Sequence, residues 1–394
     1  MDALQEYFGI KAFDFEVNKK ILIDNLNQLK SMSVEEQTFY KKCLEVQGYR
    51  DVANKLNTIK ARIWCPSDFN DEVGTIKELE NCQPELIHVE SKQHVEDWHL
   101  LRVFVSTAEF FQTPGRYLKF LIVDKNKPEM PYLGVLAVSS DVITITDRDK
   151  YIGWNTDNKI KDRKLVHSAI GSSIISTQPF GYNFLGGKLA AAMIVSNGVQ
   201  NLWKKLYGQT LVGMTTTSLY GSYSMYNSLK WWHKCGSSAG KVAIKPDGDI
   251  YKLWHNWVKE NDVEKYNKVM TQKEGISGPV TEAKSRVINM IFNACDIKQS
   301  HYMHGYERGV YYSCFYENSK EFLQNKITDE QLIMKDLFKR DMNGILDWWR
   351  PKAIERYKKL KSEGNLKTNT HFYNQMMGMS YTDAKEVYFH EVGR

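Results

Sequence analysis

The chain has 394 residues, of which 42% are hydrophobic and 25% are charged. A chain of this length can bury a sizeable core, either as two domains or as one large domain with extensions, and the composition excludes a chain that is mainly disordered. The formal net charge of +6 permits a polyanionic partner such as nucleic acid without requiring one.

The cysteines and the apolar runs indicate where the protein works. Six cysteines are scattered along the sequence, with neither a C-x-x-C pair nor a tight Cys/His cluster. Such spacing predicts reduced thiols and no bound metal. The sequence has no apolar run of about 18 residues, and its first residues lack the apolar core of a signal peptide. We therefore expect a cytoplasmic protein that does not enter a membrane, and its oligomeric state stays open.

The first third of the chain changes from helical to strand patterns. A helical period dominates its beginning, where Ser33 followed by Glu36 is a capping-box signal for a helix start. Residues 94–112 also have a helical pattern. Residues 120–124 and 132–140 are apolar and are joined by a polar turn with prolines, which predicts an antiparallel hairpin.

A dense mixture of charges and aromatic rings follows between residues 141 and 170. Charges beside aromatic rings can hold an anionic, stacked ligand such as a nucleotide or a base. The residues that we expect to contact nucleic acid here are Arg148, Lys150, Tyr151 and Trp154. A solvated loop whose charges pair with one another is the structural alternative. Whether Asp147 and Asp149 act as a base, share a metal or are ordinary loop acids stays open.

The centre of the chain reads as a strand, a turn, a helix and a second strand. The strands are expected at residues 172–177 and 209–217, and the pair Gly186 and Gly187 opens the helix between them. A helix that begins directly after a strand presents backbone N–H groups at its positive end, where a phosphate can bind. Two strands joined by a helix also predict a parallel crossover unit.

The last third of the chain contains three further patterns. Residues 241–248 suggest a β-hairpin, and residues 301–323 change from an aromatic strand pattern to a helix. Residues 335–367 form a basic helix in which Arg350 is a candidate for contact with a phosphate backbone. The alternative is a solvated helix whose tryptophans dock on the core.

The order of elements predicts an α/β (α+β) fold in which helices flank both faces of a mixed sheet, with a cleft where the two central strands splay apart. This order resembles the GNAT-type N-acyltransferase fold, in which the loop between the fourth strand and its helix holds a pyrophosphate. We expect a helical N-terminal extension at residues 1–95, a GNAT-like core at 96–250, and a C-terminal helical region with an aromatic strand segment at 251–394.

The GNAT-type resemblance implies a cofactor and its contacts. The cofactor would be an acyl-coenzyme A or a nucleotide, and the candidate contacts are Gln178, Gly186, Gly187, Lys188, Thr215 and Thr216. The turn departs from the superfamily pattern, since Asn183 stands at its first position in place of Gln or Arg and Lys188 at its last in place of Gly or Ala.

The same resemblance implies a general acid. In such transferases a tyrosine on the helix after the fifth strand protonates the leaving thiolate. Trp232 stands in that register here, and Tyr226 is the nearest replacement. The further catalytic candidates are Tyr220, Ser218 and Asp149.

A closer resemblance lies in four segments, which are RDKYIGW (148–154), FLGGKLAAAM (184–193), LYGQTLVGMTTTSLYGSYSMYN (206–227) and HGYERGVYYSCFYEN (304–318). In this order they resemble the signature segments of the Druantia anti-phage defence protein A family, which occurs in bacterial defence islands, phages and mobile elements. The two resemblances together imply a GNAT-like group transferase, of acyl type, that works in phage or anti-phage defence with nucleic acid as a candidate substrate. The alternative is a non-catalytic DNA- or RNA-binding defence or counter-defence protein that keeps the fold.

Overall fold

The computed structural model divides the chain into two compact units, each built from two stretches of sequence. The helical unit comprises Met1–Gln37 and Ala239–Tyr306, and the sheet unit comprises Thr38–Ser238 and Glu307–Arg394. The residues that the structure describes are 13–33, 36–37, 40–41, 43–44, 53–105, 115–218, 224–238, 241–271, 283–305, 307–335, 339–368, 383 and 386. The ranges expected for three domains stay a prediction.

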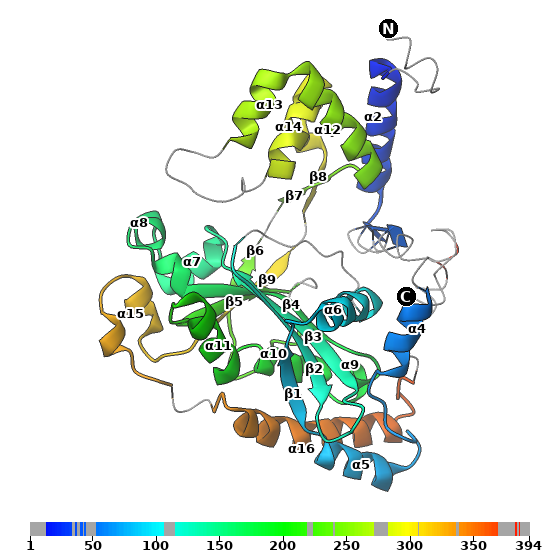
Figure 1. Cartoon of the computed structure of the whole chain (residues 1–394), viewed down its shortest axis with the longest axis vertical. Helices are drawn as coiled ribbons and strands as arrows, with labels where there is room; N and C mark the ends of the chain where they lie inside the picture. Colours follow the sequence, from blue (N-terminus) through cyan, green and yellow to red (C-terminus); the bar gives the residue numbers. More distant parts are fainter. Residues whose placement is uncertain are drawn as a thin grey trace. The chain divides into compact units, whose positions relative to one another are not determined.

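The described residues of the sheet unit form a seven-stranded mixed sheet in the order β1-β2-β3-β4-β5-β9-β6 (Figure 1). Its strands are β1 (Pro84–His88), β2 (Tyr117–Asp124), β3 (Tyr132–Ser140), β4 (Ser168–Ser176), β5 (Gly213–Thr217), β6 (His233–Ser238) and β9 (Arg308–Cys314). β4 and β5 run parallel, and every other neighbouring pair of these strands is antiparallel. The predicted α/β fold with a mixed sheet, the β2–β3 hairpin and the β4–β5 crossover are all confirmed.

Helices cover the sheet on both faces. They are α4 (Ala53–Ala61), α5 (Glu72–Asn81), α6 (Lys92–Val105), α7 (Thr146–Ile152), α8 (Thr156–Ile160), α9 (Phe180–Asn183), α10 (Gly186–Met193), α11 (Asn197–Tyr207), α15 (Ser319–Leu323) and α16 (Met342–Ser362), with the 3-10 turns η2 (Lys164–His167) and η4 (Asp329–Gln331). Alternate residues of β2 enter different cores, because successive side chains of a strand point to opposite faces. Leu118 and Phe120 pack with α10 and α16 on one face, whereas Leu121 packs with Trp98 of α6 on the other.

The crossover between β4 and β5 contains two main helices rather than one. α10 ends at Met193, and α11 begins after Ser196, whose hydroxyl caps the amide of Val199. α11 then buries Val199 and Trp203 on one side and ends at Gly208 in the left-handed conformation. The apolar spacing across 189–206 therefore belongs to two helices, of which α10 is buried over most of its length.

α16 is a long amphipathic helix that lies against the same face of the sheet as α10. Asp341 caps its first turn, and its buried side chains recur every three or four residues. These are Ile345, Leu346, Trp349, Ala353, Tyr357 and Leu360. The indole N–H of Trp349 donates to the carbonyl of Phe184 at 2.8 Å. The alternative interpretation, in which the tryptophans of this basic helix dock on the core, holds for Trp349.

The helical unit consists of α2 (Phe15–Ser31), α12 (Gly248–Asn261), α13 (Val263–Met270), α14 (Ala283–Ala294), η3 (Gln299–His301) and a two-stranded sheet of β7 (Lys241–Ala243) and β8 (Met303–Gly305). Aromatic rings hold it together, since Phe13 and Phe15 of the N-terminal stretch pack against Trp254 of α12. The capping box of Ser33 and Glu36 is present, with hydrogen bonds of 2.9 and 3.1 Å.

The hairpin expected at residues 241–248 is wrong. β7 pairs with the distant strand β8 instead of with the residues that follow it. Asp247 and Gly248 begin α12, and Asp247 exchanges hydrogen bonds with Asn25 of α2. The chain therefore continues into a helix where a hairpin would need a returning strand.

Candidate functional site

The parallel strands β4 and β5 part near the middle of the sheet. Their backbone ladder runs from the pair Ser168 and Gly213 to the pair Ile170 and Thr215. Beyond this ladder, the hydroxyl of Thr216 donates to the carbonyl of Gly171 at 3.0 Å. A side chain thus replaces the backbone N–H that would donate to this carbonyl if the two strands stayed paired. The sheet thus opens at the carboxyl end of these strands, where ligands of open α/β sheets commonly bind.

Hydroxyl groups gather at this opening. Thr216 Oγ1 lies 3.4 Å from the phenol oxygen of Tyr226, and Tyr311 Oη donates to Asn227 Oδ1 at 2.8 Å. The ring of Tyr226 packs against those of Tyr311 and Trp232, at centroid distances of 5.0 and 5.3 Å. Burial raises the pKa of Tyr226. This phenol therefore keeps its proton at neutral pH and can donate it, while its oxygen can also accept a hydrogen bond from Thr216.

The start of α10 lies against the same segment. The ammonium of Lys188 donates to the carbonyl of Asn227 at 2.6 Å and to that of Met225 at 3.4 Å. A Cβ on Gly187 would come 3.2 Å from Met225 Sδ, so glycine permits this close approach. We call Lys188, Thr216, Tyr226, Asn227 and Tyr311 the divergence site.

Two lysines lie near each other at the divergence site. Burial lowers the pKa of Lys188, and the nearby charge of Lys352 on α16 lowers it further. Lys352 is exposed. Two lysines and a helix N-terminus at one place favour an anion, because the backbone N–H groups and the helix dipole add to the charge of the side chains.

The other predicted cofactor contacts have structural roles. Gln178 and Gly186 shape the turn between β4 and α10, and Thr215 is buried beneath the point where β4 and β5 part. Gln178 Oε1 accepts from the amide of Tyr182 at 3.0 Å, which closes the turn on itself. A Cβ on Gly186 would overlap Ser176 and Phe180, so this glycine allows the turn to pack on the core. Thr215 is fully buried and donates to Asp141 at 2.7 Å.

A buried ionic network lies at the closed end of β4 and β5. The guanidinium of Arg148 bonds Asp141 at 2.6 Å and Asp149 at 2.6 Å, and Lys159 also bonds Asp149 at 2.6 Å. Burial alone would lower the pKa of Arg148, but the two carboxylates raise it, so the guanidinium stays charged. Ser168 donates to Asp141 as well. Asp149, a catalytic candidate, is held on both oxygens by cations in this network.

The predicted nucleic-acid contacts have different surroundings. Arg148 is fully buried, and Trp154 is also buried, with its indole N–H donating to the carbonyl of Leu323 at 2.6 Å. Tyr151 is half-buried and Lys150 is exposed. Arg350, on α16, donates to the carbonyl of Cys82 at 2.7 Å. The structure therefore groups Arg148, Tyr151 and Trp154 around α7 and leaves Arg350 apart from them.

Two catalytic candidates follow β5. Ser218 is buried, and its amide donates to the carbonyl of Gly309 at 2.8 Å. Tyr220 lies outside the described residues. The roles of both residues stay predictions.

Several residues at the site have little signal in the local sequence. Asn227 and Tyr311 meet there from a turn and from β9, and Lys352 comes from a helix whose pattern indicated only a basic surface. In the sequence, these residues are marked only by lying in aromatic or basic stretches. Residues so far apart in the chain meet through the fold alone.

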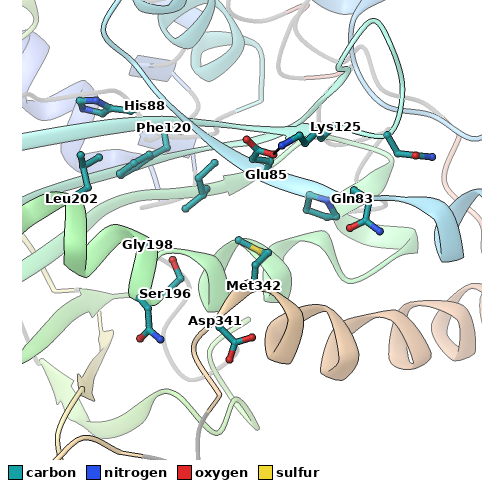
Figure 2. Close-up of a pocket in the computed structure, with 14 residues that line it drawn as sticks. Gln83, Glu85, His88, Phe120, Lys125, Ser196, Gly198, Leu202, Asp341 and Met342 are labelled. Carbon is teal, nitrogen blue, oxygen red and sulfur yellow. Dashed lines mark ion pairs between the residues drawn. The ribbon is translucent and has the colours of Figure 1, made fainter.

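A pocket of about 780 Å³ lies elsewhere, along β1. Figure 2 shows Phe120 and Leu202 at its wall and Met342 reaching it from the start of α16. The ion pair of Glu85 and Lys125, 2.7 Å long, stands beside it. None of the predicted site residues lines this pocket.

Two other kinds of site are absent from the described residues. No group of three or more His, Cys, Asp or Glu side chains gathers there as metal ligands would. Within the same residues, every helix is too short or too polar to cross a bilayer.

Comparison with known proteins gives one consistent result. The model of the family described as Druantia protein DruA matches residues 44–325. A relative named Druantia protein DruA, from Escherichia coli (strain UMEA 4076-1), is 25% identical over 227 residues, which cover 53% of this chain and 54% of the relative. The aligned region thus spans about half the length of that relative. No solved structure matches the chain. Because the family match extends over most of the sequence, the chain belongs to the Druantia protein DruA family.

Proposed function

We propose that this protein is a group transferase of anti-phage defence that works in the bacterial cytoplasm, binds a phosphate-bearing cofactor at the start of α10 and acts on nucleic acid. The observation that carries the proposal is the position of Lys188. Its ammonium lies in the first turn of α10, next to Lys352 and to the segment that bears Tyr226. A cationic helix start beside a line of hydroxyl groups suits a ligand with a phosphate at one end and a reacting group at the other.

The architecture supports a GNAT-like assignment. In the sheet order, β4 and β5 are the parallel neighbours, and the strands part at the carboxyl end of their ladder. The turn that follows β4 leads into α10, which is where the GNAT-type resemblance implies a pyrophosphate. Lys188 would supply a charge for a phosphate there, and the side chain of Met225 lies close to Gly187 at the same turn.

The roles of the chain's own groups follow from their positions. Lys188 and Lys352 would hold the phosphates, and the hydroxyl of Thr216 would orient Tyr226. Tyr226 would donate its proton to a leaving group, a role that needs a protonated phenol within hydrogen-bond reach. An acyl-coenzyme A, when bound, would supply an activated acyl group.

A second candidate function is nucleic-acid binding without catalysis. It is supported by the outer side of α16, where Lys352, Lys358 and Lys359 are exposed opposite the buried stripe. The guanidinium of Arg356, on the same helix, lies 5.1 Å from the ring centroid of Tyr182 of α9. A row of cations with adjacent aromatic groups is suited to a phosphate backbone with unpaired bases.

Mass spectrometry of nucleosides tests the transferase. DNA and RNA from cells with the protein, from cells without it, and from cells with Tyr226→Phe are digested and compared. The transferase predicts a modified nucleoside that appears with the wild-type protein and is reduced by Tyr226→Phe, which removes the proton donor and keeps the ring. Identical nucleoside profiles in all three samples, together with salt-sensitive binding of nucleic acid by the purified protein, would favour the non-catalytic alternative.

A further inference from the structure

The sheet unit carries a stacked column of side chains that is separate from the divergence site. The rings of Tyr151, on α7, and His233, on β6, are stacked with 4.2 Å between centroids and 16° between planes. The ammonium of Lys320, on α15, lies 3.5 Å from the centroid of the same tyrosine ring. Both neighbours are too close to share one face of that ring. The order of the column is therefore Lys320, Tyr151, His233.

The outer end of this column is an open imidazole. His233 is exposed although Tyr151 covers one face of its ring, so the other face meets solvent. β6 is the last strand of the described sheet, and Lys234 beside His233 is exposed as well. Charge on an edge strand commonly prevents pairing with another sheet. Protection of the sheet edge explains the exposed charge of Lys234. It does not explain why the ring of His233 is stacked on Tyr151.

The surroundings of the imidazole favour a neutral ring among positive charges. Burial lowers the pKa of His233, and Lys320 and Lys335 lower it further. The carboxylate of Asp147, on α7, lies against Gly236 of β6. A neutral aromatic face stacks with any nucleobase, and lysines beside it attract the phosphates that flank that base.

We propose that His233 is a stacking platform for an unpaired base of single-stranded nucleic acid, with Lys335 contacting the adjacent backbone. The proposal rests on the nucleic-acid part of the proposed function and names the form of the polymer. A single strand is required because the faces of paired bases are already covered by their neighbours. Tyr151 holds the imidazole in place before binding, so little conformational freedom is lost when the base arrives.

Fluorescence anisotropy with a labelled oligothymidylate tests this inference on the full chain. His233→Ala is expected to weaken binding about 10-fold, because one stacked base contributes affinity of that order. His233→Phe keeps an aromatic face and is expected to bind as the wild type does. Lys326→Ala is the matched control, since Lys326 is an exposed lysine just after α15 and outside the column. Melting temperatures of all variants show whether each is folded.

The same assay with an abasic strand of equal length separates stacking from charge. With the abasic strand, His233→Ala is expected to bind with the same affinity as the wild type. If the wild type binds oligothymidylate and His233→Ala binds equally well, the inference is overturned while the proposed function stands. An equal loss on both strands also overturns it, because the role of His233 would then not depend on a base. If the wild type binds no strand, the nucleic-acid part of the proposed function fails too.

Discussion

Arg148 has no contact with solvent, and its charge is balanced by the carboxylates of Asp141 and Asp149. Removing one member of a buried ionic group leaves the others charged and desolvated. We expect Arg148→Ala to lower the free energy of unfolding by about 3–5 kcal/mol, measured by urea denaturation. Lys161→Ala is the control, since it breaks the exposed pair with Asp157. An unfolding midpoint for Arg148→Ala equal to that of the control would contradict this account.

The surroundings of Arg148 show what local sequence does not reveal. The charged stretch was interpreted either as a nucleic-acid contact or as a loop whose charges pair. Asp149 is adjacent in sequence, but Asp141, Ser168 and Thr215 complete the network from three other segments. Composition indicated that the charges could pair. Their burial depends on strands that meet only in the folded sheet.

His167 gives a prediction for the dependence of stability on pH. Burial lowers the pKa of His167, whose Nδ1 lies 2.8 Å from the carbonyl oxygen of Thr210. As the pH falls through the unfolded value of about 6.5, the unfolded chain takes up the proton first, and stability is lost. We expect the free energy of unfolding to fall less between pH 7 and pH 5 in His167→Gln than in the wild type. Parallel profiles of the two proteins would contradict this.

At the scale of elements, α16 contributes to the fold through its buried stripe. Trp349 is fully buried and packs 5.6 Å from Phe180, centroid to centroid. We expect Trp349→Ala to lower the free energy of unfolding by about 3–5 kcal/mol, as removal of a buried tryptophan does. Trp348→Ala, next to it and half-buried, is expected to cost clearly less in the same urea titration. Equal losses in the free energy of unfolding for the two variants would contradict the packing of α16 through Trp349.

Elements formed by neighbouring residues were predicted well. The β2–β3 hairpin and the helical crossover between β4 and β5 follow from apolar runs and from the turn between them. The pairing of β7 with β8 joins residues about 60 positions apart, and no local pattern indicates such a partner. The sequence of residues 66–92 predicts only strands or loops, yet α5 forms there with Asp71 capping its first turn. Its weak apolar pattern does not distinguish it from the loops around it.

At the scale of the whole molecule, the chain returns to each unit after leaving it. Residues 239–306 leave the sheet unit after β6, join the N-terminal stretch in the helical unit and return before β9. β6 and β9 nevertheless pair as neighbours. The sheet unit therefore keeps a continuous sheet around the divergence site despite the long excursion.

The divergence site is assembled from α10, β5, β9 and the turn that contains Tyr226. The glycine pair and the hydroxyl-rich stretch were recognised from the sequence, because both lie close to strand ends. Their contacts could not be predicted, since the distance between Lys188 and Asn227 depends on how the crossover packs. What the site binds is the central claim of the proposed function.

Isothermal titration calorimetry with coenzyme A tests that claim most directly. The wild-type protein is expected to bind, and Lys188→Ala is expected to bind at least 10-fold more weakly, because charge-assisted bonds to a phosphate contribute about 1.5–3 kcal/mol each. Lys205→Ala, which removes an exposed lysine of α11, is expected to bind as the wild type does. Binding of coenzyme A that is equal in the wild type and Lys188→Ala, or no binding by the wild type, would contradict the account.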